Sequence, residues 1–437
     1  MSNPIFIARQ DTLEQEILPA HWLAQYKLFG EESYTFQDKG IWKKLCMSSA
    51  AANDRDMHAE ALEEMLTTFS AEHTGKWMLL VYGTNAAALE GLATMAAIAA
   101  NGTAMGAIVD NALLMHAIAN SETAMQRIAN SQTAMQRVAN NRGAMDAIGR
   151  SRIARDAVQA SPYYNSCIKE NDMAIAKLAV ALANFESAGY SGMAGVAADS
   201  TAMTAVAASA TAMTAVAASS VARNAISASP YYDEKIKEND MAIAKLVVGF
   251  ANLASANYSS MAGVVADATA MTAVAASSTA MTAVAASSTA MTAVAASGVA
   301  LKAIAQAYKN TANMLQFLKA VNASDTLIKR IYNTLTNATA LFGASQLGAQ
   351  DGVADANSWA TTSAAPNAFL ACACGYYNSG GANVDVTYNG TAIAQNKTGT
   401  RQPGSVTSTN VNAITMAPST FTENGDGWLA VQKFTVK

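Results

Sequence analysis

Residues 261–300 read MAGVVADATA, MTAVAASSTA, MTAVAASSTA and MTAVAASGVA, so one ten-residue unit recurs four times with little variation. A fixed period predicts a repeated structural element. In one straight helix the apolar stripe would rotate by about 80° per unit, which argues against a continuous coiled coil. A strand is disfavoured because apolar and polar residues do not alternate and alanine is frequent. The pattern therefore predicts one short helix of about eight residues per unit.

Within a unit, Met281, Val284 and Ala285 have the i, i+3, i+4 spacing of one helical face. The serine pair that follows, Ser287 and Ser288, interrupts this face and supplies an N-cap for the next helix. Isolated helices of this length are unstable in water, so they must be stabilised by packing on their neighbours. The arrays are therefore expected to form an α-solenoid of very short helices.

Weaker copies of the unit precede this stretch. Their recurring and variable positions predict which face of each helix is buried and which is exposed. Six methionines recur at intervals of ten, and each is followed three positions later by isoleucine or valine: Met95, Met105, Met115, Met125, Met135 and Met145, with Ile98, Ile108, Ile118, Ile128, Val138 and Ile148. The position directly after the methionine varies freely, as His116, Gln126, Gln136 and Asp146 show. A methionine stripe is compatible with a metal site or an adhesive groove, but flexible filling of an alanine-rich core is the favoured interpretation.

Composition restricts the class of protein. The chain has 437 residues, of which 14% are charged, and its net charge of −4 gives no electrostatic case for binding nucleic acid or an anionic membrane. No apolar run is long enough for a membrane-spanning helix, and the first residues lack the features of a secretory signal. The cysteines, which are Cys46, Cys167, Cys372 and Cys374, match no zinc spacing and are expected to be reduced and mostly buried. Neither a metal nor a cofactor is predicted.

Residues 1–90 are expected to form a mainly α N-terminal domain outside the repeats, because they hold most of the tryptophans and histidines. Asp56 and Glu60 flank His58 on a predicted helix, and a solvated helix face is favoured over a metal site. The first decapeptide array follows at residues 91–160. It is expected to fray where Arg155 replaces the methionine and to end at Pro162.

A larger duplication comes next. SPYYNSCIKENDMAIAKLAVALAN (161–184) recurs 68 residues later as SPYYDEKIKENDMAIAKLVVGFAN (229–252). This predicts two modules, residues 161–228 and 229–307, each with a longer helix (171–186 and 239–254) followed by a short array. The expected N-caps are Asn171 or Asp172 and Asn239 or Asp240. The tyrosine pairs at 163–164 and 231–232 are interpreted as packing between modules rather than as sugar-binding groups, because they are copied with their surroundings.

The C-terminal part changes from helix to strand. Residues 308–348 are expected to form a helical neck, whose apolar face (Leu315, Leu318 and Val321, then Leu327, Ile331 and Leu335) suits helical contacts between chains. After a linker-like stretch of small residues, residues 349–437 contain short strand patterns, and Asn389-Gly390 is a strong hairpin signal. The fold class is thus multidomain α+β: a mainly α N-terminal domain, an α-solenoid and a C-terminal antiparallel β-sandwich.

Enzymatic chemistry has little support, and the chain is not expected to be an enzyme. No phosphate-binding loop, zinc-protease motif or local nucleophile–histidine set is present. Asp385, Glu423 and Asp426 could be assigned as glycosidase carboxylates only if their separation were known. The ENGDG segment around Asp426 lacks the ligands of a calcium loop, so a glycine-rich turn is preferred.

The decapeptide, as STAMTAVAAS and variants such as SETAMQRIAN, resembles repeats of tail-fibre and virion appendage proteins of tailed bacteriophages over residues 95–305. The resemblance implies a virion protein that is assembled in the host cytoplasm. Its N-terminal domain would bind other virion proteins, its arrays would act as a spacer, and residues 355–437 would meet a glycan or protein of the host surface. It also implies a homo-oligomer, with a trimer favoured. The middle of this chain departs from the β or coiled-coil shafts common in such fibres.

Binding by the C-terminal domain would fall to loops on a β scaffold. Aromatic and amide residues at predicted turns give the candidate receptor contacts Tyr376, Tyr377, Asn378, Asn424 and Asp426. The alternative is a head fibre or a baseplate or collar protein without receptor binding. A bacterial repeat adhesin is a third class, which the missing export signal disfavours.

Overall fold

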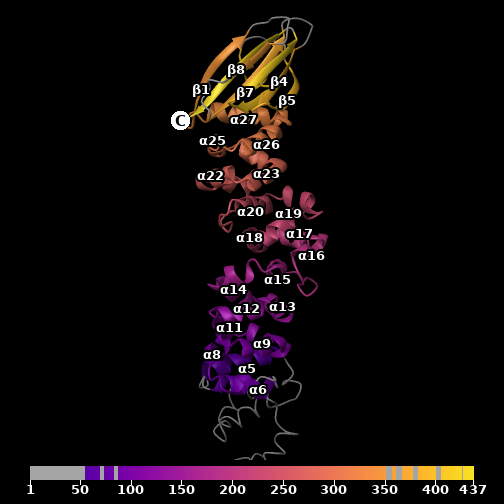
Figure 1. Cartoon of the computed structure of the whole chain (residues 1–437), viewed down its shortest axis with the longest axis vertical. Helices are drawn as coiled ribbons and strands as arrows, with labels where there is room; N and C mark the ends of the chain where they lie inside the picture. Colours follow the sequence, from indigo (N-terminus) through magenta and orange to yellow (C-terminus); the bar gives the residue numbers. More distant parts are fainter. Residues whose placement is uncertain are drawn as a thin grey trace, which may run out of the picture. The chain divides into compact units, whose positions relative to one another are not determined.

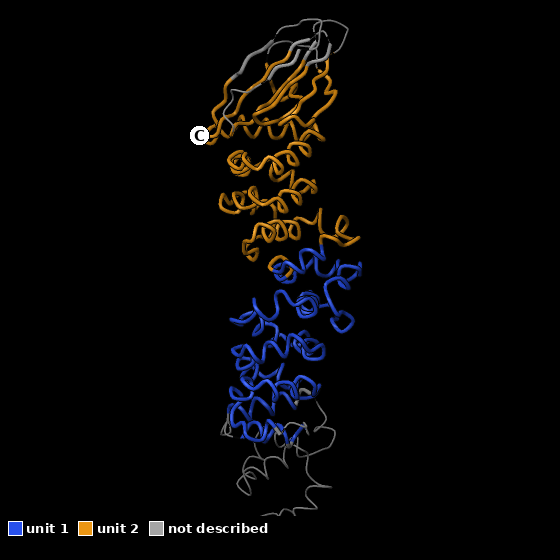
Figure 2. Tube along the Cα trace, viewed as in Figure 1, with its two compact units in different colours: residues 1–215, 219–226 blue, residues 216–218, 227–437 orange. Residues whose placement is uncertain are grey.

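The computed structural model describes residues 55–68, 73–82, 87–350, 357–360, 367–376, 382–399, 405–425 and 427–437. These residues are mainly helical, with antiparallel strands toward the C-terminal end, so the class is broadly α+β. The chain divides into two compact units, residues 1–215 with 219–226 and residues 216–218 with 227–437 (Figure 2). The division at residue 227 falls beside the expected boundary between the duplicated modules.

The helices of the first part of the chain follow the decapeptides (Figure 1). Before the array come α5 (Arg55–Thr68), α6 (Thr74–Tyr82) and α7 (Ala87–Glu90). The array itself consists of α8 (Met95–Ala100), α9 (Gly102–Asp110), α10 (Ala112–Ala119), α11 (Glu122–Ala129), α12 (Gln132–Ala139), α13 (Arg142–Arg150) and α14 (Arg152–Ala160). Next along the chain are the π-helix η5 (Tyr164–Ile168), α15 (Asp172–Leu182), α16 (Met193–Ala197), α17 (Ser200–Ala208), α18 (Ala210–Ala218) and α19 (Ser220–Ser227). One short helix per decapeptide is therefore confirmed.

Each array helix begins at a polar side chain that accepts a hydrogen bond from the main chain two or three residues later. These capping residues are Thr94, Asn101, Asn111, Ser121, Ser131, Asn141 and Ser151. Such caps satisfy donors that the first helical turn leaves free. The six predicted methionines and their isoleucine or valine partners are at most 3% exposed. The predicted inner face is confirmed, and the methionines fill the core.

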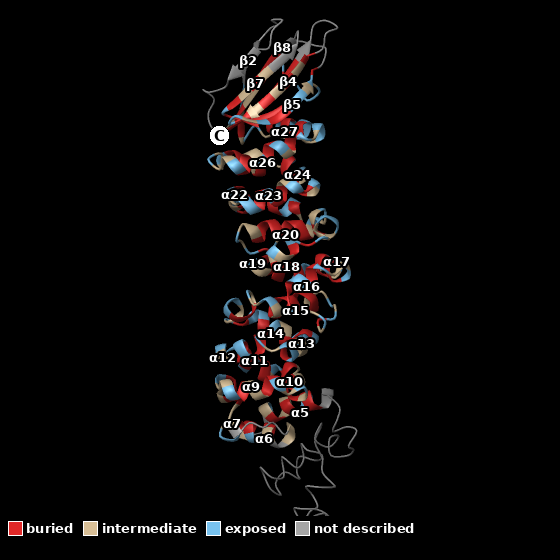
Figure 3. Cartoon of the chain, turned by 45° about the vertical axis from the view of Figure 1, so that its right-hand side comes forward, coloured by how far each residue is buried: buried red, intermediate tan, exposed pale blue. Residues whose placement is uncertain are grey.

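Successive helices turn sharply, and α9 and α10 meet at 102°. Helices three apart along the chain then contact each other: α9 with α12, α10 with α13, and α11 with α14. In Figure 3 the buried residues, drawn in red, lie on the sides of the helices that face these neighbours. Three helices, or thirty residues, therefore make up one structural period within the first unit.

Capping serines also connect one period to the next. The hydroxyl groups of Ser131, Ser151 and Ser161 donate to main-chain oxygens 32 residues earlier, at 2.6, 2.6 and 2.5 Å. The acceptors are Ala99, Ala119 and Ala129, which lie in the last turns of α8, α10 and α11. The hydroxyl groups of Ser131 and Ser151 thus each cap the start of one helix and satisfy a carbonyl that the end of another helix leaves free.

The second unit repeats this arrangement. Its helical elements are η6 (Asp233–Lys237), α20 (Asp240–Phe250), α21 (Met261–Ala266), α22 (Ala268–Ala276), α23 (Ser278–Ala286), α24 (Ser288–Ala295), α25 (Gly298–Gln306), α26 (Thr311–Asn322) and α27 (Asp325–Asn337). Contacts again join helices three apart, from α20 with α23 to α24 with α27. The Ser297 hydroxyl donates to the main-chain oxygen of Val265 at 2.7 Å, once more across 32 residues.

Two helical expectations need correction. The unit containing Arg155 does not fray, because α14 is complete and its Ala154 and Val158 are buried. The longer helices α15 and α20 start at the predicted caps Asn171 and Asn239 but have only 11 residues each. They end early because Asn184 and Asn252 adopt the left-handed conformation, with φ of 54° and 57°, that commonly terminates a helix.

The strands form two four-stranded sheets in which every described pair is antiparallel. One sheet has the order β1-β8-β3-β6, with β1 (Phe342–Gln350), β8 (Gly427–Val436), β3 (Ala368–Tyr376) and β6 (Ala413–Met416). The other has the order β2-β7-β4-β5, with β2 (Asn357–Ala360), β7 (Ser419–Gly425), β4 (Ala382–Tyr388) and β5 (Thr391–Thr398). The predicted hairpin is confirmed between β4 and β5, where Asn389 and Gly390 have φ of 47° and 77°.

The linker expected at residues 343–358 is wrong over residues 343–350 and 357–358, which lie in strands, while residues 351–356 lie outside the described residues. Phe342 to Gln350 form strand β1, which pairs with β8 from Phe342 opposite Val436 to Gln350 opposite Leu429. Main-chain pairing holds this strand, and its glycine, alanine and glutamine residues give no alternating pattern to detect.

Helices α26 and α27 pack against the strands of the same unit (Figure 1). Buried Asn322 donates to the main-chain oxygen of Ile414 at 2.7 Å and accepts from its N–H at 3.1 Å. The Tyr332 hydroxyl lies 2.7 Å from the main-chain oxygen of Val406. Leu318, Val321, Ile331 and Leu335 of the predicted apolar stripe are buried inside one chain, and Leu315 and Leu327 are half-buried. Most of the stripe that suggested contacts between chains is therefore already covered.

Candidate binding groove

The predicted receptor contacts fall mostly beyond the described residues. Tyr376 is the last residue of β3, with its main chain opposite Gly427, and Asn424 lies in β7 opposite Asn383. Tyr377, Asn378 and Asp426 lie outside the described residues. Their role in receptor binding stays a prediction.

The alternative sites are not assembled by the described residues. Asp385 accepts a hydrogen bond from the Asn396 N–H at 2.6 Å, and its cross-strand partner is Thr422 rather than Glu423. The His58 ring is buried 5.5 Å from the ring of Tyr82. Across the described ranges, no group of three or more His, Cys, Asp or Glu side chains could hold a metal ion.

Three of the four cysteines lie in the described part of the chain: Cys167, Cys372 and Cys374. All three are free thiols and are buried, as predicted. Burial raises the pKa of the Cys372 thiol, so this group is not a ready nucleophile.

Glutamates with lowered pKa values have structural partners. Glu170 accepts hydrogen bonds from Ser220 and Val221 at the start of α19, and Glu238 accepts them from Ser288 and Thr289 at the start of α24. Burial alone would raise the pKa of each carboxyl group, but these hydrogen bonds outweigh it and lower both values. A carboxylate is also favoured at a helix N-terminus. Both groups therefore act as helix caps supplied by the duplicated modules.

A buried lysine occurs at the same position of each module, with different partners. The Lys177 ammonium group, fully buried, lies 2.5 Å from a carboxylate oxygen of Asp146 and donates to the main-chain oxygen of Ser187 at 2.9 Å. Lys245, 2% exposed, donates to the main-chain oxygens of Ser255 and Ala256 at 2.9 and 3.3 Å. The residue 68 positions after Asp146 is Thr214, so the second module did not keep this carboxylate. Both lysines are enclosed by protein, but Lys177 holds a carboxylate in an ion pair, whereas Lys245 bonds only to main-chain oxygens among the described residues.

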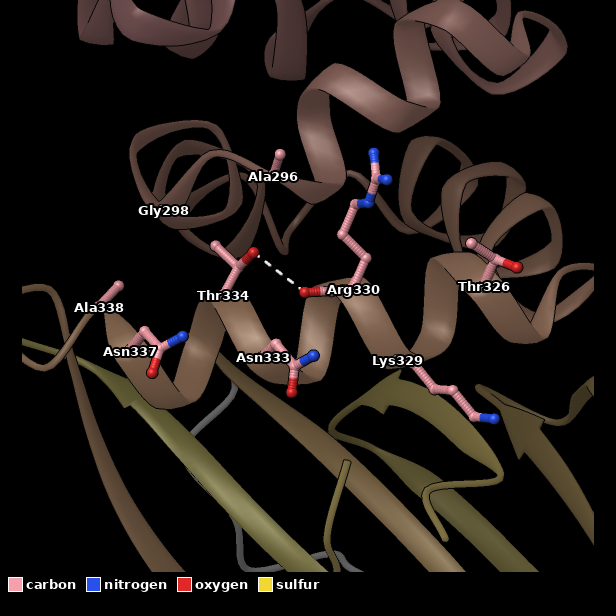
Figure 4. Close-up of a pocket in the computed structure, with 9 residues that line it drawn as sticks. All are labelled: Ala296, Gly298, Thr326, Lys329, Arg330, Asn333, Thr334, Asn337 and Ala338. Atoms are coloured by element: carbon pink, nitrogen blue, oxygen red, sulfur yellow. Dashed lines mark hydrogen bonds between the residues drawn. The ribbon is translucent and has the colours of Figure 1, made fainter. Parts of the chain in front are cut away.

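A groove of about 680 Å³ lies beside α27 in the second unit (Figure 4). The outer face of α27 supplies one wall, and the joint between α24 and α25 supplies the other. The lining residues are Ala296, Gly298, Thr326, Lys329, Arg330, Asn333, Thr334, Asn337 and Ala338. Figure 4 shows the Arg330 side chain rising toward the α24–α25 side and Lys329 extending away from it, with Asn333 and Asn337 between Lys329 and the end of the helix.

Close packing at one end shapes this groove. Gly298 replaces the serine found at this position in the two preceding repeats. A Cβ atom at Gly298 would lie 3.0 Å from the Cβ of Ala338 and 3.1 Å from Leu341. Thr334 fixes the wall further, because its hydroxyl donates to the main-chain oxygen of Ala295 at 2.8 Å. The first turn of α25 can therefore approach the end of α27 closely.

The groove lies in a cationic segment of an acidic protein. Residues 296–342 contain Lys302, Lys309, Lys319, Lys329 and Arg330 but only one acidic residue, Asp325, in a chain of net charge −4. Asp325 forms an exposed ion pair with Lys397 at 3.0 Å. Within the described residues, Lys329 and Arg330 have no carboxylate within ion-pair distance. Sequence reasoning missed this site, although the run of basic residues was visible.

The comparisons identify no relative. No protein-family model matches the chain, and no curated protein matches its sequence. Among the described helices none is long and apolar enough to cross a membrane singly, while four bent pairs meet the requirement by length and composition alone.

Proposed function

We propose that this chain is a structural protein of a bacteriophage virion, most simply a tail fibre. Its N-terminal residues attach to other virion proteins, its decapeptide arrays act as a spacer, and residues 349–437 contact the host surface. It works as a homo-oligomer, with a trimer favoured, and carries out no catalysis. The assignment to a phage rests on the likeness of the decapeptides to phage appendage repeats.

One observation supports the spacer role above all others. Hydroxyl groups of capping serines bond to carbonyl oxygens 32 residues earlier in both units. The same kind of bond thus recurs between helices that are one period apart. We propose that the arrays are α-solenoids, in which repeats contact only near neighbours and can be gained or lost without refolding the remainder.

The two sheets are proposed to face each other as a sandwich. Contacts between β3 and β4 and between β7 and β8 support this, as do inward residues such as Phe369, Val386 and Phe421, all fully buried. A sheet core of this kind would hold binding loops rigidly.

The alternative is a head fibre or a baseplate or collar protein, in which the C-terminal region packs on another virion subunit. The largely covered apolar faces of α26 and α27 suit either protein equally.

Binding of the full-length protein, fluorescently labelled, to a panel of bacterial cells tests the receptor role. We expect saturable binding to host cells and at least a tenfold loss for the variant Tyr377→Ala/Asn378→Ala, because truncating a hot-spot residue, for which tyrosine is enriched, costs about 2 kcal/mol or more. Lys169→Ala/Lys235→Ala, on the helical modules, is the control and should bind normally. Equal binding by all three proteins would exclude these residues as receptor contacts, and absence of saturable binding would favour the alternative.

A further inference from the structure

We propose that the groove along α27 binds an acidic polysaccharide, a chain of sugars bearing carboxylate groups. This site is separate from the predicted receptor contacts and goes beyond the proposed function, so either can fail without the other. The groove combines unpaired cations with side chains that bond to hydroxyl groups.

The two basic side chains of the groove favour a negatively charged ligand. Lys329 and Arg330 are exposed, lie side by side in sequence, and have no carboxylate partner among the described residues. A guanidinium group binds carboxylates through two parallel hydrogen bonds, which gives direction as well as attraction. The smaller groove of the first unit differs, because its Arg150 already pairs with Glu186 at 3.4 Å and its Arg155 bonds to the main-chain oxygen of Gly149.

The polar uncharged side chains of the groove favour a ligand that carries hydroxyl groups. Asn333 and Asn337 each offer amide donors and a carbonyl acceptor, and Thr326 adds a hydroxyl. Sugar hydroxyl groups both donate and accept, so they can satisfy these side chains, whereas an inorganic anion would leave the amide acceptors unused.

Two other polymers fit the lining less well. The only aliphatic side chains in the described lining are those of Ala296 and Ala338, so the groove has no pocket for the apolar anchors that peptides commonly use. It has no aromatic side chain on which nucleic-acid bases could stack.

The length of the groove suits a polymer. Thr326 and Asn337 are eleven positions apart on α27, which corresponds to about 16 Å along the helix axis. Arg330 and Asn333 lie between them, so the polar groups are spread along the helix. An extended anionic chain can contact all of them, and a single small anion cannot.

The test measures binding of the full-length protein to immobilised polygalacturonate, with dextran as the neutral sugar and poly-glutamate as the acidic peptide. We expect polygalacturonate to bind most tightly and to weaken as salt rises, since the attraction is partly exposed to solvent. Lys329→Gln/Arg330→Gln should reduce its affinity at least tenfold. Lys309→Gln/Lys319→Gln removes the same charge from exposed positions outside the groove and should reduce it less than threefold.

A third variant separates sugar recognition from charge. Asn333→Ala/Asn337→Ala keeps the net charge and should weaken polygalacturonate by at least threefold while leaving poly-glutamate unchanged. All variants change exposed positions, and unaltered circular dichroism and melting temperature would establish that they fold. The proposal is overturned if polygalacturonate does not bind, if poly-glutamate binds as tightly, or if both charge variants lose affinity equally.

Discussion

Replacing Lys177 by methionine is expected to lower the free energy of unfolding by about 3 kcal/mol, because it leaves the carboxylate of Asp146 without its cation. That carboxylate is only 17% exposed and is further held by the hydroxyl of Ser187 at 3.1 Å. Removing one partner of a buried pair costs more than removing both, since the remaining charge keeps its desolvation penalty. Urea denaturation of the full-length protein, followed through the transition of the first unit, measures the effect.

The second module supplies the matched control. Lys245→Met removes a buried cation that has only main-chain carbonyl partners among the described residues, so the stability should change by less than about 1 kcal/mol or should increase. A loss as large as that of Lys177→Met would contradict the assignment of different roles to the two lysines.

The contribution of Lys245 to stability is expected to depend on pH. Burial lowers the pKa of Lys245 below its ordinary value of 10.5. Between the two values the unfolded state holds more protons than the folded state, so stability from this group rises with pH. The advantage of Lys245→Met over the wild type should therefore be largest near neutral pH and shrink in alkaline buffer.

Gly249→Ala is expected to destabilise the second unit by about 3 kcal/mol, as overpacking of a filled core does. An added Cβ would lie 2.3 Å from the main-chain oxygen of Ala217 and 2.9 Å from its Cβ. Thermal unfolding of the full-length protein would report the loss as a lower midpoint for the second unit.

The duplication also suggests a second variant, which separates the side-chain contact from the main-chain contact. The equivalent pair in the first module is Gly149 and Ala181, so the glycine there stands on the opposite helix. Each interface thus has one methyl group and one glycine. Ala217→Gly combined with Gly249→Ala removes the 2.9 Å contact with the Ala217 Cβ but keeps the 2.3 Å contact with its main-chain oxygen, so only a minor part of the lost stability should return. A double variant as stable as the wild type would show that the main-chain oxygen of Ala217 does not limit the packing.

Local features of the fold were predictable from the sequence. Each decapeptide carries its own cap and its own apolar face, as Ser287, Met281 and Val284 illustrate, so helix length and inner face follow from neighbouring residues. Asn389-Gly390 likewise specifies its turn locally. The contact of helices three apart was not predictable, because it depends on the 95–102° bends between helices and on hydrogen bonds such as Ser151 to Ala119, across 32 residues.

Strand β1 and the groove likewise depend on residues that lie far apart in the sequence, so neither was predicted. β1 was mistaken for a linker because it is held by main-chain pairing with β8, 86 or more positions away along most of its length, and not by an alternating pattern. The groove joins α27 to the α24–α25 joint, and no local motif connects Arg330 with Ala296. Two signals could have indicated it: the excess of basic residues after residue 300 and the change of serine to Gly298 in the last repeat.

The stacking of helices in periods of three is tested most directly by small-angle X-ray scattering on a lengthened protein. Duplicating residues 121–150 inserts α11, α12 and α13 once more. Each array helix can then still contact an array helix three positions away along the chain. We expect the maximum dimension to grow by about 10 Å, one layer of helices, with cooperative unfolding retained. An unchanged maximum dimension, or loss of cooperative unfolding, would contradict the proposed solenoid.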